Sequence, residues 1–247
     1  SSSSPASAAT AAAHKYIHKK KTFDSNSMAY RSLSMPRIAI IGYGVVGRAL
    51  GAVMAEKVKG AKFMAYDAAV TGRSVGKVRI AKTMKEAVQG ADFLLVCVPS
   101  HLGGKGVEGA GWKRLAQQIA KAAEPSAIVV IKSTLVPGDA AKLQDLTCRR
   151  VVVCPEFMSE GTADRDILKP HRVLVGGQDE DAVDDVVSLY RAWVPASRII
   201  RMDAWSAQLA KLLTNAMLAQ RVSSINSLTA LCEKSGGDIR AVAHAVG

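Results

Sequence analysis

Residues 37–47 read Arg37-Ile38-Ala39-Ile40-Ile41-Gly42-Tyr43-Gly44-Val45-Val46-Gly47, and this stretch decides the fold. Five strand-forming residues run into glycines at the spacing G-x-G-x-x-G, and residues 45–58 then show the apolar spacing of a helix. A second apolar strand over 62–66 ends in Asp67, twenty positions past Gly47. This context predicts a strand, glycine turn, helix and strand that bind a dinucleotide.

Each residue of this unit has a physical task. Gly42 permits the tight turn, Gly44 lets a pyrophosphate approach the backbone, and Gly47 lets helix and strand pack closely. The start of the helix then holds the phosphate charge. Asp67 would accept hydrogen bonds from ribose hydroxyls and repel a 2′-phosphate, so the sequence favours NAD over NADP. The alternative interpretation is a structural glycine turn followed by a surface aspartate.

Composition limits the classes of function. With 247 residues the chain can bury a full core and hold one large or two small domains. No apolar run approaches the roughly 20 residues of a membrane span, so we expect no transmembrane segment. The four cysteines form no C-x-x-C pair and the five histidines show no ligand spacing, so we predict reduced thiols and no metal site. The net charge of +12 favours anionic partners, although ordinary solubilising charge explains it equally well.

Residues 1–36 differ in composition from the rest. They are rich in Ser and Ala and carry five basic residues against Asp24, a net charge of +4. Such a segment cannot bury a core, so we interpret it as a basic targeting-like extension or partner-binding tail. We predict a mitochondrial location, with the cytoplasm as the alternative. The cluster that favours contact with an acidic protein face, RNA or acidic lipid is Lys15, Lys19, Lys20 and Lys21.

From Arg37 onward, strand and helix patterns alternate. Strands are expected over 93–98, 127–131, 151–154, 173–175 and 199–201, and helices over 84–89, 112–123 and 180–192. The alternation predicts an α/β domain over 37–202, a Rossmann-type doubly wound parallel sheet with ligands at the carboxyl ends of its strands. A long helix over 204–235, with Asp203 and Gly236 as caps, and a short helical segment after it form a further region, 203–247.

Three more segments carry polar residues that a bare dinucleotide domain does not need. They are Ile131-Lys132-Ser133-Thr134-Leu135-Val136-Pro137-Gly138, Cys154-Pro155-Glu156-Phe157-Met158-Ser159-Glu160-Gly161-Thr162-Ala163, and Lys211-Leu212-Leu213-Thr214-Asn215. Together with the glycine loop and with residues 216–227, they resemble the UDP-glucose/GDP-mannose dehydrogenase family. The resemblance runs from Arg37 to Gly247, with the motifs in the family order.

The resemblance implies a reaction and roles for residues. These enzymes oxidise the C6 alcohol of a nucleotide sugar to a carboxylate in two hydride transfers to NAD, through a thioester on a cysteine. By resemblance, Thr134 and Glu156 position water and act in acid and base steps, while Lys211 stabilises developing oxyanion charge. Asn215 binds the substrate and completes the catalytic set. Taken singly, Lys211 is also explained as a solvated helix charge, Thr134 as a strand-end cap and Glu156 as a turn residue.

The resemblance also implies the binding residues. The substrate contacts are Phe157, Met158, Glu160, Lys211 and Asn215. The NAD contacts are Gly42, Tyr43, Gly44, Val45, Val46, Gly47, Asp67, Val98, Pro99, Ser133 and Thr134. Because the long helix packs between subunits in the family, we expect a homodimer, or contacts with other subunits, through residues 204–235.

Some features depart from the family pattern. The sequence ends at Gly247, before the segment that carries the family's nucleophilic cysteine and its aspartate, and neither Cys154 nor Cys232 occupies that motif. Only fifteen residues separate Asp67 from Thr83, fewer than in the family. One hypothesis is therefore a catalytically incomplete homologue, a noncatalytic structural subunit of a larger organellar assembly. The other is an active NAD-dependent member that oxidises UDP-glucose to UDP-glucuronate, seen as a fragment.

Overall fold

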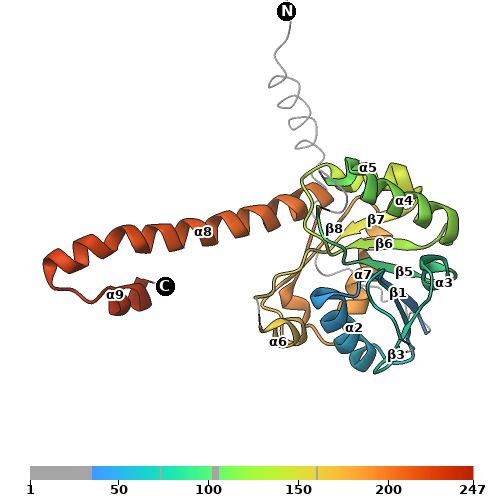
Figure 1. Cartoon of the computed structure of the whole chain (residues 1–247), viewed down its shortest axis with the longest axis horizontal. Coiled ribbons are helices and arrows are strands. Elements are labelled where there is room, and N and C mark those ends of the chain that lie inside the picture. The colour runs from blue at the N-terminus through green and yellow to red at the C-terminus, as the bar shows by residue number, and fades with distance from the viewer. Residues whose placement is uncertain (1–34, 73, 102–105, 160, 247) are drawn as a thin grey trace, which may run out of the picture. The chain divides into compact units, whose positions relative to one another are not determined.

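A nine-stranded sheet forms the centre of the computed structural model, which describes residues 35–72, 74–101, 106–159 and 161–246 (Figure 1). Within these ranges the strand order is β3-β4-β2-β1-β5-β6-β7-β8-β9. The strands are β1 (Arg37–Ile41), β2 (Lys62–Tyr66), β3 (Ser74–Val75), β4 (Val78–Ile80), β5 (Phe93–Val96), β6 (Ile128–Ile131), β7 (Arg150–Val153), β8 (Val173–Gly177) and β9 (Ile199–Met202). The helices are α2 (Val45–Lys57), α3 (Met84–Val88), α4 (Ala110–Ala122), α5 (Asp139–Thr147), α6 (Ala163–Leu168), α7 (Glu180–Tyr190), α8 (Ala204–Ser235) and α9 (Ile239–Val246).

The sheet is doubly wound, as predicted. From β1 the chain moves outward to β2 and β4, then returns to add β5, β6 and β7 on the other side of β1, all in parallel. The strand order therefore reverses between β1 and β5. In open α/β sheets, ligands bind at such a reversal, outside the carboxyl ends of the strands.

The sheet is mostly parallel, as predicted, and departs from the parallel pattern at two places. β3 and β4 form a small antiparallel pair, and β8 runs antiparallel to β7. In the described part of the connection from β7 to β8, the only helix is α6, which is six residues long and packs on α2. Since no crossover helix returns the chain to the amino edge, β8 starts from the edge at which β7 ends. The loop after β7 and the residue before β8 thus share one edge.

Helices cover both faces of the sheet (Figure 1). Alternate residues of each strand point to opposite faces, so Ile38 and Ile40 pack with α2, α6 and α7, while Ala39 and Ile41 pack with α3, α4 and α5. The central strands are buried on both faces, which explains their continuous Val, Ile and Leu runs.

The long helix α8 begins and ends at the predicted caps. The Asp203 carboxylate accepts the Ser206 N–H at 2.8 Å, and Gly236 closes the helix in the left-handed conformation. Its first turn lies against β8 at Gly176, where a Cβ would come within 2.6 Å of the Ala207 Cβ, so only glycine permits this contact. Most of the helix beyond Thr214 is exposed. No described helix, α8 included, is long and apolar enough to cross a membrane.

All described residues belong to one unit, 31–247. Residues 1–34 lie outside the described residues. The interpretations placed on the extension 1–36, its mitochondrial destination and its RNA or lipid contacts, therefore stay predictions. The domain boundaries at 36 and 203 stay predictions as well.

Candidate functional site

The glycine loop lies between the carboxyl end of β1 and the start of α2. Gly42 has a φ of 91°, and a Cβ there would lie 2.8 Å from the backbone carbon of Cys97, just past β5. At Gly47 a Cβ would lie 2.1 Å from the Gly42 oxygen. Both positions therefore require glycine: Gly42 packs on the end of β5, and α2 approaches β1 closely.

Gly44 has a different environment. It is exposed, and nothing lies within 4 Å of a Cβ built on it. Gly44 is also the N-cap of α2, and no side chain of the described residues caps this helix. The loop thus presents open space and unpaired N–H groups at a helix start, the arrangement that accepts a pyrophosphate.

Asp67 closes the loop from the end of β2. Its two carboxylate oxygens accept the N–H groups of Tyr43 at 2.7 Å and Ala69 at 2.8 Å. The Gly42 N–H donates to the Tyr66 carbonyl at 2.9 Å, which ties β2 to the loop. Because each carboxylate oxygen has a further lone pair, Asp67 can still accept a ribose hydroxyl. The carboxylate thus lies beside the loop.

The ends of β5 and β6 meet beside the loop. The Ser133 hydroxyl donates to the Val98 carbonyl, with the Val96 carbonyl 3.3 Å away. Thr134 is half-buried, and its hydroxyl has no partner among the described residues. The two predicted hydroxyls therefore differ, since Ser133 fixes the end of β5 while Thr134 remains available to a ligand.

Lys132, one residue earlier, is buried with 4% of its surface exposed. Its Nζ donates to the Tyr190 hydroxyl at 2.8 Å, lies 3.1 Å from Oε2 of Glu156 and 3.5 Å from Sγ of Cys154. These partners follow β7 or end α7. An ammonium has three N–H donors, so three partners satisfy it and make its burial tolerable.

Only one of these three partners carries charge. Burial alone would lower the pKa of Lys132, but Cys154, Glu156 and Tyr190 raise it well above its ordinary range. Burial raises the pKa of the Cys154 thiol and of the Tyr190 phenol, so both are neutral at pH 7. Glu156 is therefore the anion that balances Lys132. Burial likewise raises the pKa of Cys97 to about 12, which keeps that thiol neutral.

Lys211 reaches the same region from α8. Its Nζ lies 4.9 Å from the ring centre of Phe157, the residue after Glu156. Burial lowers the pKa of Lys211, and Glu156 opposes that change. Within the described residues no carboxylate lies within ion-pair distance of this ammonium. Lys211 thus lies near Glu156 without an ion-pair partner among the described residues.

The structure brings together only part of the predicted catalytic and substrate sets. Glu156, Phe157 and Lys211 adjoin one another, and Met158 is half-buried against the core. Asn215 lies one turn beyond Lys211 on α8 and is exposed. Glu160 lies outside the described residues. The catalytic and substrate roles of these residues stay predictions.

Sequence reasoning gave no role to Lys132 or to Tyr190. A lysine that directly follows a buried strand was a signal for Lys132, because such a charge needs a partner. Tyr190 had no local signal, since its contact with Lys132 spans 58 positions.

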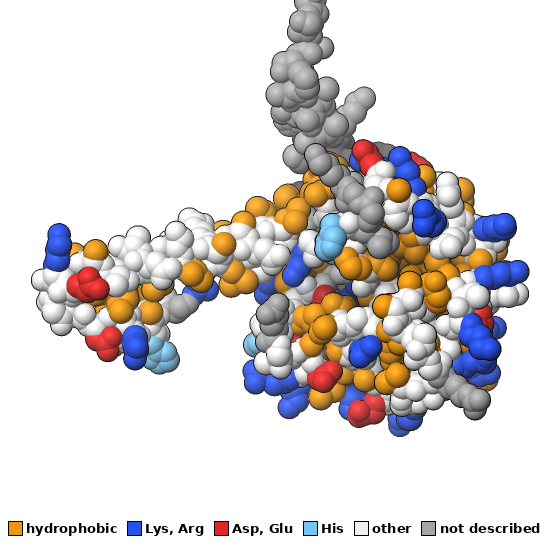
Figure 2. Space-filling view, viewed as in Figure 1, with side chains coloured by type: hydrophobic (Ala, Val, Ile, Leu, Met, Phe, Trp, Pro, Cys, Tyr) orange, Lys and Arg blue, Asp and Glu red, His pale blue; other side chains and the backbone are white. Residues whose placement is uncertain are grey.

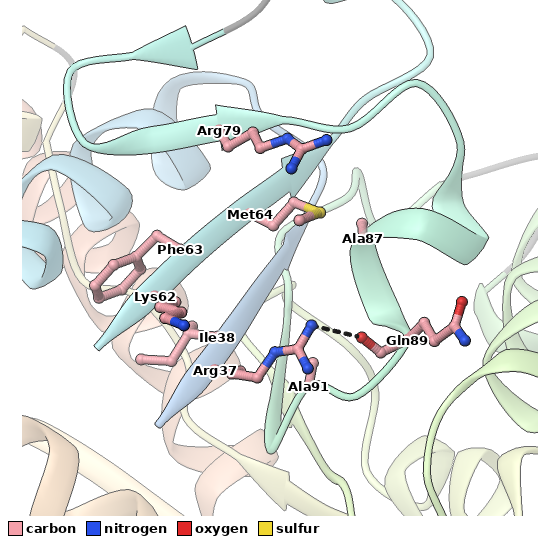
Figure 3. A pocket seen from close by; sticks show the side chains of 9 residues that line it. All are labelled: Arg37, Ile38, Lys62, Phe63, Met64, Arg79, Ala87, Gln89 and Ala91. Carbon is pink, nitrogen blue, oxygen red and sulfur yellow. Dashed lines mark hydrogen bonds between the residues drawn. The ribbon is translucent and has the colours of Figure 1, made fainter. Parts of the chain in front are cut away.

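A separate pocket lies at the opposite edge of the sheet (Figure 3). It has a volume of about 340 Å³, and its lining includes Arg37 and Lys62, the first residues of β1 and β2. The Arg37 guanidinium donates to the Gln89 carbonyl at 3.3 Å. Because the pocket lies at the amino ends of these strands, it is distinct from the dinucleotide loop.

In the described part of the chain, no group of three His, Cys, Asp or Glu side chains could hold a metal ion.

Comparison with known proteins agrees with this geometry. Residues 66–194 match the NAD binding domain of the UDP-glucose/GDP-mannose dehydrogenase family, and residues 205–247 match its central domain. Residues 6–117 match the NAD binding domain of D-isomer specific 2-hydroxyacid dehydrogenases. Thus an NAD-binding domain is present.

The chain is also similar to curated proteins and solved structures. UDP-glucose 6-dehydrogenase 1 of Arabidopsis thaliana is 39% identical over 170 residues, which is 63% of this chain and 35% of that protein. UDP-glucose 6-dehydrogenase 1 of Oryza sativa subsp. japonica is 42% identical over 177 residues, 64% of this chain and 36% of that protein. A UDP-glucose dehydrogenase structure from Pyrobaculum islandicum has a TM-score of 0.72 at 24% identity and covers 89% of this chain and 58% of its own, a likeness of fold. The chain spans about a third of the length of the curated relatives.

The Lys132–Glu156 pair makes a prediction about stability. Lys132→Met leaves a carboxylate unpaired in a largely buried place, so urea unfolding should show a loss of about 3 kcal/mol. Adding Glu156→Gln to the Lys132→Met variant removes the unpaired carboxylate and should restore about 1 kcal/mol or more of the lost free energy of unfolding. Lys57→Met removes a lysine that pairs only with the exposed Glu56 among the described residues, so this control should lower the free energy of unfolding far less.

The effect of Lys132→Met on the free energy of unfolding should also depend on pH. Since the folded state raises the pKa of Lys132, its stabilisation is complete below the unfolded value of about 10.4 and is lost as the pH rises through the folded value. The difference in free energy of unfolding between the native protein and Lys132→Met should therefore be constant from pH 6 to about pH 9. It should become smaller at higher pH. A double variant no more stable than Lys132→Met would contradict the pairing.

Proposed function

The chain belongs to the UDP-glucose/GDP-mannose dehydrogenase family, and from that premise we propose that it binds NAD at the carboxyl edge of its sheet for hydride transfer from a nucleotide sugar of the UDP-glucose type. The observation that carries the proposal is the Asp67 carboxylate bonded to the Tyr43 N–H of the glycine loop. This bond sets a ribose acceptor beside the open space at Gly44. Both features fit a dinucleotide.

Different residues of the chain have different roles in the proposed reaction. The N–H groups at the start of α2 bind the pyrophosphate, and Asp67 orients the adenosine ribose. Bound NAD supplies the hydride acceptor. Glu156 accepts the proton of the sugar hydroxyl, which leaves negative charge on that oxygen until the hydride departs from the adjacent carbon. The Lys211 ammonium stabilises this negative charge. Lys132 keeps Glu156 in place.

The cofactor preference can be measured by calorimetry. We expect the full chain to bind NADH more tightly than NADPH, because the Asp67 carboxylate repels a 2′-phosphate. Asp67→Ala should weaken NADH binding and narrow the preference by about tenfold or more, which corresponds to about 1.4 kcal/mol. Asp164→Ala, which removes an exposed aspartate from α6, is the control and should change neither affinity. Equal affinities in the native protein would contradict the ribose contact.

We also propose that α8 pairs with a second copy of the chain. Apolar side chains line the helix beyond its first turns (Figure 2). Those that are more than half exposed are Leu213, Met217, Leu218, Val222 and Leu231. Apolar surface of this extent on one helix favours burial against a partner. The predicted role as a noncatalytic structural subunit has no observation in its favour and stays a prediction.

Sedimentation should show this pairing. Leu218 and Val222 are four positions apart and face one side of α8, so replacing both by Glu should convert a dimer to a monomer. Ser223→Glu adds charge at an exposed position that lies roughly 80° or more around the same helix from all five of these apolar residues, so it should leave the dimer intact. A native chain that sediments as a monomer at all concentrations would remove the proposal.

A further inference from the structure

Phe157 is contacted by two cationic side chains. Besides the Lys211 ammonium at 4.9 Å, the Arg172 guanidinium carbon lies 4.5 Å from the centre of its ring. Each distance is within the range of a cation–π contact. Arg172 comes directly before β8, whose antiparallel course brings this residue to the edge where Glu156 follows β7. Two like charges therefore share one aromatic ring next to a carboxylate.

Arg172 is also connected to the helix that carries Lys211. Its Nη2 donates to the Thr214 hydroxyl at 3.5 Å, and that hydroxyl donates to the Ala210 carbonyl at 2.8 Å. Thr214 lies three positions after Lys211, so it belongs to the same turn. Arg172 thus contacts both the ring against which Lys211 rests and the helical turn from which Lys211 extends.

We propose that Arg172 is a positioning residue that, through the Phe157 ring and Thr214, holds the Lys211 ammonium at the substrate side of the site. The inference rests on the proposed function for the importance of Lys211, but its geometry does not depend on catalysis. Arg172 itself needs no contact with the substrate for this role. It acts through Phe157 and through the turn of α8.

The charged groups around Lys211 determine its response to pH. They are Glu156 after β7, Arg172 before β8 and Lys132 after β6. Burial lowers the pKa of Lys211, Glu156 raises it, and Arg172 and Lys132 lower it again. Removal of the guanidinium should therefore raise this pKa, since a like charge is lost while Glu156 remains.

The test is nuclear magnetic resonance of the full chain labelled with ¹³C-lysine, with Lys211 assigned by its loss in Lys211→Arg. In the native protein the Lys211 methylene signals should be displaced by the Phe157 ring and should titrate below those of the exposed lysines. In Arg172→Gln the displacement should disappear and the titration should move up by about 0.5 unit or more. Arg172→Lys, which keeps a cation, should restore much of both effects.

A matched control separates this role from general loss of an arginine. Arg198 donates to the Pro170 carbonyl and does not face Lys211, so Arg198→Gln should leave both readouts unchanged. Lys211 signals that are the same in Arg172→Gln and in the native protein would overturn the proposal. If Arg172→Gln fails to fold, Arg172→Lys decides, and a complete loss of the ring displacement there overturns it. NADH affinity, measured separately, tests the proposed function and leaves this result intact.

Discussion

The close approach of α2 to β1 is the constraint on which the site depends. A side chain at Gly47 would meet the Gly42 oxygen at 2.1 Å, so the helix can start directly over the strand end only because both residues are glycine. The start of α2 then opens at the carboxyl edge of the sheet. Since β1, β2, β5, β6 and β7 are parallel, their carboxyl ends meet at this same edge, and Asp67, Ser133 and Glu156 lie near one end of the fold.

Charge balance is the second feature of the site. Lys132 is buried and neutralised by Glu156, while Lys211 has no carboxylate within ion-pair distance among the described residues. One lysine therefore pairs with a carboxylate, and the other is the one for which we propose a role toward a ligand. A lysine in the first situation affects mainly stability, whereas one in the second affects the charge that a bound substrate meets.

The sequence predicted what local patterns determine. The observed bounds of β2 and α8 match the predicted ones, and those of α2 match to within one residue, because apolar spacing, glycine and caps act over a few positions. The antiparallel course of β8 was missed, since it depends on how the chain returns after a six-residue helix. The contact of Lys132 with Tyr190 was also missed because it depends on the tertiary fold. The two residues are 58 positions apart, and no local pattern around either one indicates the other.

Hydrogen exchange of the full chain with and without NADH tests the central claim most directly. We expect slower exchange on binding at residues 42–48 and 66–70, the glycine loop with the start of α2 and the segment around Asp67. We expect no change at residues 79 and 87–91, which belong to the pocket at the opposite edge. Protection at that pocket, with exchange at the glycine loop unchanged, would contradict the proposed binding site.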